Sequence, residues 1–427
     1  MMSSTVTALL IFVAAYSLII SGKVHRTIVG IIGAMLMVLL GIIDQETAIR
    51  HIDFNTLGLL MGMMIIVNVT SETGFFKFLA VWSVKKVHAQ PIKVLVALSA
   101  LTAICSALLD NVTTVLLTVP ITFSITQQLK IDVKPFLIAQ ILSSNIGGTA
   151  TLIGDPPNIM IASAVGLSFM DFILNLAAPA IGIFAITIAL IILIYRDKLH
   201  TQPVLQDKVM KLSSHSKITD KKLLTKCMVS LALTFVLFVM HNRLGLETAT
   251  AALTGAGFLL MFTARRDDAM IAKTLNRIEW MVIFFFAGLY VLVGALVETG
   301  VIEMLAARMM DLTCGSVETT AISILWLSAL ASAFIDNIPF VATLIPLIKD
   351  MGAMGLTNLE PMWWSLALGA CLGGNGTLIG ASANVMVATL AKEKGHALNF
   401  IEFMKIAFPM MILSIAISTA YVLWRYL

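Results

Sequence analysis

Charged residues are scarce in this chain of 427 residues. Only 12% of the residues are Asp, Glu, Lys or Arg, whereas 59% are hydrophobic, and the mean hydropathy is +0.97. Soluble domains carry roughly 25% charged residues, so this composition excludes water as the main solvent of the chain. We therefore expect the lipid bilayer to be its main partner, and we expect no nucleic-acid partner.

Cysteine is also scarce and shows no recognisable spacing. The four cysteines lack the short spacings of a metal site and the pairing pattern of a disulfide framework. We expect small, buried, apolar side chains at these positions and no metal site. Cys105 and Cys371 lie near the motifs described below, but their repeat counterparts are Ala331 and Asn145, which disfavours a paired thiol site for a metalloid.

Signatures of pumps and proteases are missing. The chain has no Gly-x-x-x-x-Gly-Lys loop, which disfavours a primary pump, although a separate ATPase subunit could bind the cytoplasmic loops. An intramembrane aspartyl protease needs a Gly-x-Gly-Asp context, which neither Asp110 nor Asp155 has. Residues 6–20 lack the basic lead-in and cleavage site of a signal peptide. We expect a retained first helix, no enzyme activity, no catalytic residue and no cofactor.

Apolar runs long enough to cross about 30 Å of hydrocarbon recur along the chain. They predict an all-α polytopic membrane protein with about ten transmembrane helices, of which two are broken, and two re-entrant hairpins. The predicted full spans are 5–20, 27–43, 55–70, 135–168 (broken), 175–196, 223–240, 246–263, 278–296, 363–391 (broken) and 403–424. The predicted hairpins are 92–127 and 318–350.

Lysine and arginine predict the orientation in the membrane. If both hairpins enter and leave on one side, 23 of the 28 Lys and Arg residues fall in cytoplasmic loops. The exceptions are Arg50, Arg243, Arg308, Lys349 and Arg425. This distribution predicts a multi-pass protein of the inner (plasma) membrane with both termini external.

The two halves of the chain repeat each other at a constant offset of 226 over roughly residues 52–162. Each half contains five predicted crossings, an odd number, so the second copy would insert upside down, as in many alternating-access carriers. We expect a first inverted repeat at 1–196, a cytoplasmic linker at 197–222 and a second inverted repeat at 223–427. Matching pairs include Glu72 and Glu298, Pro120 and Pro346, Gly147 and Gly373, and Asn158 and Asn384.

Two Asp-Asn pairs occupy the predicted hairpin tips, Asp110-Asn111 and Asp336-Asn337. A carboxylate at membrane depth costs about 2.5–3.5 kcal/mol even on lenient scales, so it is normally paired, protonated or ion-bound. We interpret both pairs as proton or cation sites, with Thr113 and Thr114 enriching the first. The alternative is that Asp and Asn only cap the turns.

Two Gly-rich motifs interrupt the predicted broken helices. Non-helical backbone at membrane depth is tolerated where it is buried in protein or lines a cavity, and half-helix ends there bind ions. The alternative for each Gly pair is close helix packing. Asp155, whose repeat counterpart is Ala381, is either a coupling-proton site or a cap before Pro156. The candidate binding residues here are Asn145, Gly147, Gly148, Thr149, Thr151, Asp155, Asn158, Gly373, Gly374, Asn375, Thr377 and Asn384.

At Asp110-Asn-Val-Thr-Thr and Asn145-Ile-Gly-Gly-Thr-Ala-Thr-Leu-Ile-Gly-Asp-Pro-Pro-Asn158 the chain resembles the ion transporter superfamily. That superfamily contains arsenite permeases of the ArsB type, sodium/proton antiporters of the NhaD type and the melanosomal P protein. The resemblance spans nearly the whole chain and is strongest to the P-protein and ArsB branch. It implies a scaffold part, a mobile transport part and a homodimer.

The resemblance favours a secondary active transporter for a small molecule or ion, coupled to H⁺ or Na⁺. The first hypothesis is proton-coupled efflux of arsenite or antimonite by alternating access, because uncharged arsenite tolerates acidic walls. The alternatives are a sodium/proton antiporter of the NhaD type and a symporter of organic or inorganic anions. The superfamily's dicarboxylate carriers have Ser-Asn-Thr at the hairpin tips, whereas this chain has Asp-Asn, which disfavours a dianion unless cations neutralise it.

Overall fold

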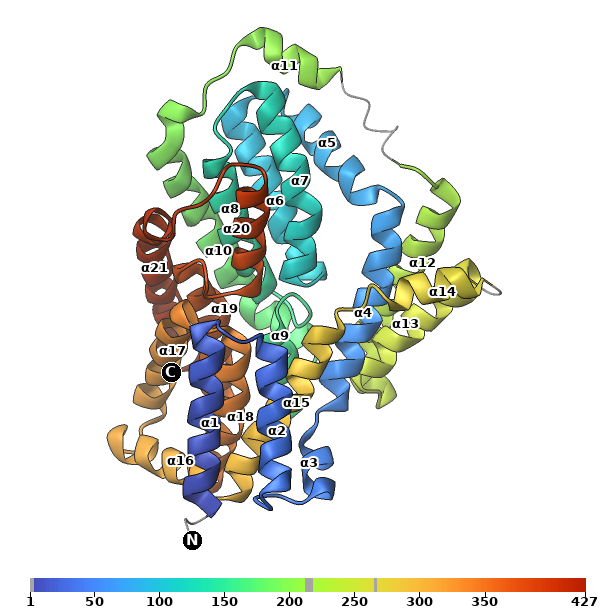
Figure 1. The fold of residues 1–427 in the computed structure, drawn as a ribbon. Helices are drawn as coiled ribbons and strands as arrows, with labels where there is room; N and C mark the ends of the chain where they lie inside the picture. The colour runs from blue at the N-terminus through green and yellow to red at the C-terminus, as the bar shows by residue number, and fades with distance from the viewer. Residues whose placement is uncertain (1–3, 212–217, 265–266) are drawn as a thin grey trace.

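The computed structural model describes residues 4–211, 218–264 and 267–427. Residues 212–217, in the predicted linker, and 265–266, in a predicted cytoplasmic loop, lie outside the described residues. The described residues form α-helices and short 3-10 helices without any β-strand (Figure 1). The predicted all-α polytopic class is confirmed.

Nine helices in the described ranges are long and apolar enough to cross a membrane. The number differs from the predicted ten spans for two reasons. The nine include three arms of the hairpins, and they leave out the short helices and the broken helices. The nine are α1 (Ser4–Ser21), α4 (Phe54–Glu72), α6 (Pro91–Leu108), α7 (Asn111–Leu129), α10 (Phe169–Tyr195), α12 (Lys221–Leu244), α15 (Trp280–Glu298), α17 (Val317–Phe334) and α21 (Phe400–Tyr426). Two shorter apolar helices are α2 (Arg26–Leu39) and α13 (Thr248–Thr263).

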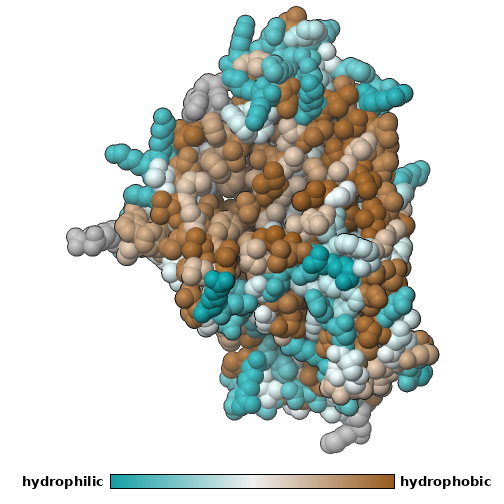
Figure 2. Space-filling model, turned by 180° about the vertical axis from the view of Figure 1, so that it is seen from behind, coloured by the Kyte–Doolittle hydropathy of each residue, from teal (hydrophilic) through white to brown (hydrophobic). Residues whose placement is uncertain are grey.

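Hydrophobic residues cover much of the outer surface. On the face shown in Figure 2 they dominate the middle, while hydrophilic residues gather toward the upper and lower ends. Large apolar side chains are exposed in several helices, including Leu39, Ile181 and Trp424. A monomeric soluble protein rarely exposes a patch of this size, so we assign this surface to lipid contact.

The inverted repeat appears directly in the helix boundaries. Helices α4, α5 (Phe75–Lys86) and α6 return 226 residues later as α15, α16 (Val301–Leu312) and α17, with identical lengths. The hairpin α6–α7 lies in the upper part of Figure 1, and the hairpin of α17 and α18 (Asn337–Ala353) lies in the lower part. Their tips point toward the middle of the molecule from opposite ends. The boundaries 1–196, 197–222 and 223–427 stay predictions.

Several short helices occupy segments that the sequence had assigned to loops. They are too short to cross a bilayer, so span length gave no signal for them. Besides α5 and α16, they are α3 (Gln45–His51), α11 (Pro203–Met210) and α14 (Asp268–Leu275), and a 3-10 turn, η1 (Arg196–Lys198), follows α10. Helix α11, within the predicted linker, packs against α7. Just before α11, the Thr201 hydroxyl donates a hydrogen bond to the Leu129 carbonyl at the end of α7.

The broken helices satisfy their interrupted backbone with an asparagine. Helix α8 (Lys134–Thr149) and α9 (Pro156–Val165) are separated by residues 150–155, and α19 (Glu360–Gly373), η3 (Gly374–Gly376) and α20 (Ser382–Glu393) repeat this arrangement. The Asn158 amide donates to the carbonyls of Gly148 (3.3 Å), Thr149 (3.3 Å) and Thr151 (2.9 Å). The Asn384 amide donates to those of Gly374 (2.7 Å) and Thr377 (2.8 Å). These bonds replace the water that lipid cannot supply.

The glycine pairs allow the broken helices to approach the hairpins closely. A Cβ atom on Gly147 would lie 2.2 Å from the Ala103 carbonyl oxygen, and one on Gly373 would lie 2.5 Å from that of Ala329. Both positions therefore serve close helix packing, which was the alternative interpretation of these pairs. Whether the neighbouring backbone also binds a ligand stays a prediction.

We predict that Gly373→Ala destabilises the protein, because its new methyl group overlaps the Ala329 backbone. The expected loss is about 1–3 kcal/mol in the free energy of unfolding. Thermal unfolding in detergent, followed by tryptophan fluorescence, measures it. The control is Gly182→Ala in α10, whose Cβ position is open. An unchanged melting temperature for Gly373→Ala would contradict the packing role.

Candidate transport site

Asp155 lies where both hairpin tips meet the first broken helix. This residue is only 1% exposed. The Asn111 amide nitrogen donates to Asp155 Oδ1 (3.4 Å), and the Asn337 amide nitrogen lies 3.3 Å from both carboxylate oxygens. One carboxylate from the first half therefore contacts the tips of both halves.

Asn145 continues this contact into the second broken helix. Its amide nitrogen donates to the side-chain oxygens of Asn375 and Asn384, each at 2.9 Å. Its own oxygen accepts a longer bond, 3.5 Å, from the Asn111 amide. Because the amide group has two N–H donors and an oxygen, Asn145 can make all three bonds at once. The centre of the protein is thus a buried amide network around one carboxylate.

The two hairpin-tip aspartates cap their helices. Asp110 Oδ1 accepts a bond from the Thr113 backbone N–H (2.8 Å), and Asp336 Oδ1 accepts one from that of Ile338 (3.2 Å). Capping, the alternative interpretation, therefore describes one role of each residue. Proton or cation binding by these carboxylates stays a prediction.

Asp336 has a partner that Asp110 lacks. The Arg26 guanidinium, at the start of α2, donates to Asp336 Oδ2 and to the Ser382 hydroxyl (2.9 Å). Ser382 in turn donates to Asp336 Oδ2 (3.0 Å). Among the described residues, no ion pair includes Asp110. The two sites, which the sequence predicted to be unequal, thus differ in their charge partners.

A cavity of about 560 Å³ opens onto this centre. It brings together four carboxylates, one guanidinium and the asparagines of both hairpin tips. The polar residues that line it include Asp110, Asn111, Asp155, Glu279, Asp336, Asn337, Arg26 and His25. The acids do not converge on one point, and within the described ranges no cluster of three or more His, Cys, Asp or Glu could hold a metal ion.

Other predicted site residues lie behind the cavity wall. The hydroxyls of Thr151 and Thr377 donate to the carbonyls of Ala107 and Ala333, which ties each broken helix to its hairpin. Thr149 donates to the Asn145 carbonyl (2.8 Å). These contacts position the site and place no hydroxyl of these three residues in the cavity lining. The lining also leaves out Thr113, Thr114, Asn145, Gly147, Gly148, Asn158, Gly373, Gly374, Asn375 and Asn384.

Two charged residues of the cavity, Arg26 and Glu279, were not predicted as site residues from the sequence. Arg26 counted there only as a marker of the cytoplasmic face. Glu279 directly precedes α15, and Asp53 stands 226 residues earlier, directly before α4. A repeated acid at the start of two apolar helices was a signal that could have identified Glu279. Cys371 also lies close by, since its thiol is 3.5 Å from Asn158 Oδ1, whereas Cys105 packs in a separate apolar cluster.

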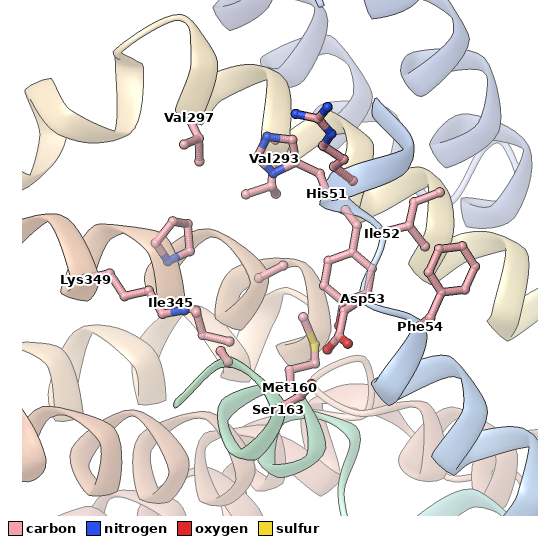
Figure 3. A pocket seen from close by; sticks show the side chains of 16 residues that line it. His51, Ile52, Asp53, Phe54, Met160, Ser163, Val293, Val297, Ile345 and Lys349 are labelled. Atoms are coloured by element: carbon pink, nitrogen blue, oxygen red, sulfur yellow. The ribbon is translucent and has the colours of Figure 1, made fainter. Parts of the chain in front are cut away.

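A second cavity, of about 440 Å³, matches the first through the repeat (Figure 3). Asp53, Met160, Ser163 and Tyr290 line it, and their counterparts in the other half, displaced by 226 residues, line the first cavity. Those counterparts are Glu279, Met386, Thr389 and Met64. The hairpin tips and Asp155 line the first cavity alone. The protein thus has two related cavities, of which one reaches the central carboxylate.

The model of the citrate transporter family, CitMHS, matches residues 16–369 of this chain. The chain belongs to this family. It is 40% identical over 430 residues to a 46 kDa membrane protein of Mycobacterium leprae, with 99% of each chain covered. An uncharacterized transporter of Mycobacterium tuberculosis is 41% identical over 428 residues, again with 99% of each chain covered.

The human P protein is 32% identical over 496 residues, which include 97% of this chain and 59% of the P protein. The crystal structure of the YdaH transporter of Alcanivorax borkumensis, described as having an unusual topology, is similar with a TM-score of 0.61. It is 14% identical, with 94% of this chain and 98% of that chain covered, so it supports the fold alone. The chain is therefore a membrane transporter of the citrate transporter family. The resemblance to the P protein is confirmed, and the ArsB type stays a prediction.

We predict that Arg26 and Asp336 stabilise the protein as a pair. Arg26→Gln leaves a partly buried carboxylate without its cation, because the two side chains are 26% and 15% exposed. A double-mutant cycle with Asp336→Asn should give a coupling energy of about 1–3 kcal/mol, measured by thermal unfolding. Lys23→Gln is the control for loss of charge in the same loop. Strictly additive effects of the two substitutions would contradict the pairing.

Proposed function

We propose that the chain is a secondary active transporter that works by alternating access, and that its reaction is proton-coupled efflux of arsenite or antimonite. The observation that carries the proposal is the buried Asp155 carboxylate held by asparagine amides from both hairpin tips. The inverted repeat and its two matched cavities support alternating access. If the two halves exchanged conformations, the second cavity would reach the central carboxylate in place of the first.

Asp155 is the proposed carrier of the coupling proton. An ionised carboxylate accepts both amide bonds, whereas protonation adds a donor and leaves less acceptor capacity for Asn111 and Asn337. Protonation at this point would therefore change the contacts of both hairpin tips together. Asp110 and Asp336, which line the same cavity, would hold further protons. Sodium is the alternative coupling ion, because carboxylate and amide oxygens also suit a hard cation.

The charge of the cavity supports a neutral substrate. Four carboxylates and one guanidinium line the space, and like charges repel a dianion or trianion strongly where water is excluded. Arsenite, an uncharged trihydroxide, can donate to carboxylates and accept from amide groups. A sodium/proton antiporter of the NhaD type would use the same acids without a solute.

Anion symport is the second candidate. The family model is described as a citrate transporter, and Arg26 supplies one guanidinium at the cavity wall. A carboxylate anion would fit beside Arg26 if it entered with cations that neutralise it. This candidate predicts that citrate flux requires a co-transported cation.

The setting proposed for this activity is the inner (plasma) membrane, with both termini external. A homodimer and a cytoplasmic ATPase subunit remain proposed partners. We propose no cofactor. The coupling ion would enter from the external face as the substrate leaves the cell.

Flux in proteoliposomes tests the proposed function. Under an imposed pH gradient, with arsenite, sodium and citrate offered separately, we expect proton-driven arsenite movement by the unaltered protein. Asp155→Asn should lower the coupled rate by about 100-fold, because it keeps the shape of the side chain and removes its proton site. Asp110→Asn should lower it as well.

The control is Asp197→Asn, since this acid lies outside the cavity with its side chain 90% exposed. Sodium-driven proton movement without arsenite flux would select the antiporter. Cation-dependent citrate flux would select the symporter. Full coupled activity in Asp155→Asn would reject Asp155 as the carrier in all three cases.

A further inference from the structure

A set of buried polar side chains follows the first hairpin and its neighbouring helix. We call this set the polar seam. Every member is at most 2% exposed although it lies within an apolar bundle. The members are Ser99, Thr102 and Ser106 on α6, Thr114, Thr118, Thr122 and Thr126 on α7, and Gln140, Ser143 and Ser144 on α8.

The seam begins at the central carboxylate. Ser144 donates to the Asn111 carbonyl (3.2 Å), and the Asn111 amide contacts Asp155. Farther along, Gln140 donates to the Thr102 hydroxyl (3.1 Å), which lies 3.4 Å from that of Thr118. Direct contacts therefore link the three helices along this set.

The seam ends near one end of the protein. Thr114, Thr118, Thr122 and Thr126 recur at every fourth position of α7, which extends the set about 18 Å along the helix at 1.5 Å per residue. Thr126 stands next to the exposed Gln127, beside the end of α7 that α11 contacts. This is the end of the hairpin that the sequence predicts to be cytoplasmic.

Several polar atoms of the seam have no protein partner. The hydroxyls of Ser99, Thr114 and Ser143 and the Oε1 atom of Gln140 are buried without a hydrogen bond. They are four of the six such side-chain atoms found among the described residues. Buried polar groups are nearly always paired with protein or with water, so four orphans in one set indicate bound water.

The second half shows that the fold does not need a polar side chain at several of these positions. At the positions displaced by 226 residues, Thr114 becomes Phe340, Thr118 becomes Leu344, Thr122 becomes Ile348 and Gln140 becomes Leu366. Thr102 and Ser106 keep a hydroxyl there, as Ser328 and Ser332, but the threonine row of α7 and the glutamine of α8 are replaced by apolar side chains at these four positions. The polarity of the first hairpin therefore has a purpose other than packing.

We propose that the polar seam is a water-filled passage that carries protons between Asp155 and the predicted cytoplasmic end of the first hairpin. This inference rests on the proton coupling of the proposed function. Water molecules bridging the unpaired atoms would form the hydrogen-bonded chain, and the threonine hydroxyls would extend it toward Gln127. In each transfer an O–H bond of the donor breaks as an O–H bond of the acceptor forms. Asp155 therefore loses its carboxyl O–H bond to the first water, each water or threonine hydroxyl on the way gives up one proton as it accepts another, and one proton leaves the far end.

The first test is direct observation of water. A cryo-electron microscopy map that resolves ordered water should show density within hydrogen-bond distance of Gln140 Oε1 and of the Thr114 hydroxyl. A dry seam in such a map would overturn the proposal. This readout needs no substrate, so it stays decisive even if arsenite is not transported.

The second test interrupts the passage by replacing polar seam residues with apolar ones, as in the second half. Gln140→Leu copies Leu366, and Thr118→Val, a smaller change, serves if that variant does not fold. Under a pH gradient with arsenite as the probe, either should slow transport by about tenfold or more and raise the solvent deuterium isotope effect, with unchanged arsenite affinity. The matched control is Ser365→Ala, which removes an unpaired buried hydroxyl outside the seam and copies Ala139.

The outcomes separate this inference from the proposed function. Wild-type rates in both seam variants would overturn the passage while leaving proton-coupled transport intact. Equal slowing by Ser365→Ala would also overturn it, because the effect would then be general to buried hydroxyls. Absence of proton coupling in the unaltered protein would reject the proposed function, and with it the passage as a proton path.

Discussion

The structure depends on satisfying the backbone of the two broken helices at membrane depth, where lipid supplies no hydrogen bonds. Two helices stop near the middle of the bundle and expose carbonyls that lipid cannot hydrate. Asn158 and Asn384 supply the missing donors, one for each break. The side-chain oxygen of Asn384 also accepts a hydrogen bond from the Asn145 amide. The residue that satisfies the break in the second half therefore also binds the first half. These amides thus satisfy the backbone at both breaks beside the hairpin tips.

These hydrogen bonds at the breaks determine where the central carboxylate lies. Once the breaks are fixed, α9 starts at Pro156, and the residue before it is held at the meeting point of the two hairpins. The first half has an aspartate there, Asp155, and the second half has Ala381. An inverted repeat built from equal halves therefore contains one central carboxylate. The polar seam follows the same half, since the apolar counterparts of Thr118 and Gln140 are Leu344 and Leu366. Fold symmetry and chemical asymmetry thus coexist in one chain.

Much of this arrangement could be predicted from the sequence because it is local or periodic. Apolar run length predicted the helices, and the offset of 226 predicted the paired hairpins and breaks. The offset holds for α4 and α15, but α1 and α2 stand 217 and 222 residues before α12 and α13, so register alone could not pair the first helices. Side-chain direction also gave no signal. Both residues of each Asp-Asn pair were candidates, yet the asparagine reaches Asp155 while the aspartate caps its helix.

Contacts between distant segments account for what the sequence could not show. Arg26 and Asp336 are 310 residues apart, and neither residue's neighbours indicate the other. Their contact sets the charge of the cavity, since it neutralises one tip aspartate and leaves Asp110 facing Asp155 and Glu279 across the same space. A positive ion or a proton entering this cavity therefore meets a stronger attraction on the side of the first hairpin. That is the side on which the polar seam reaches the central carboxylate, so the ion pair, the unpaired acid and the seam all favour the first half as the route of the coupling ion that we propose.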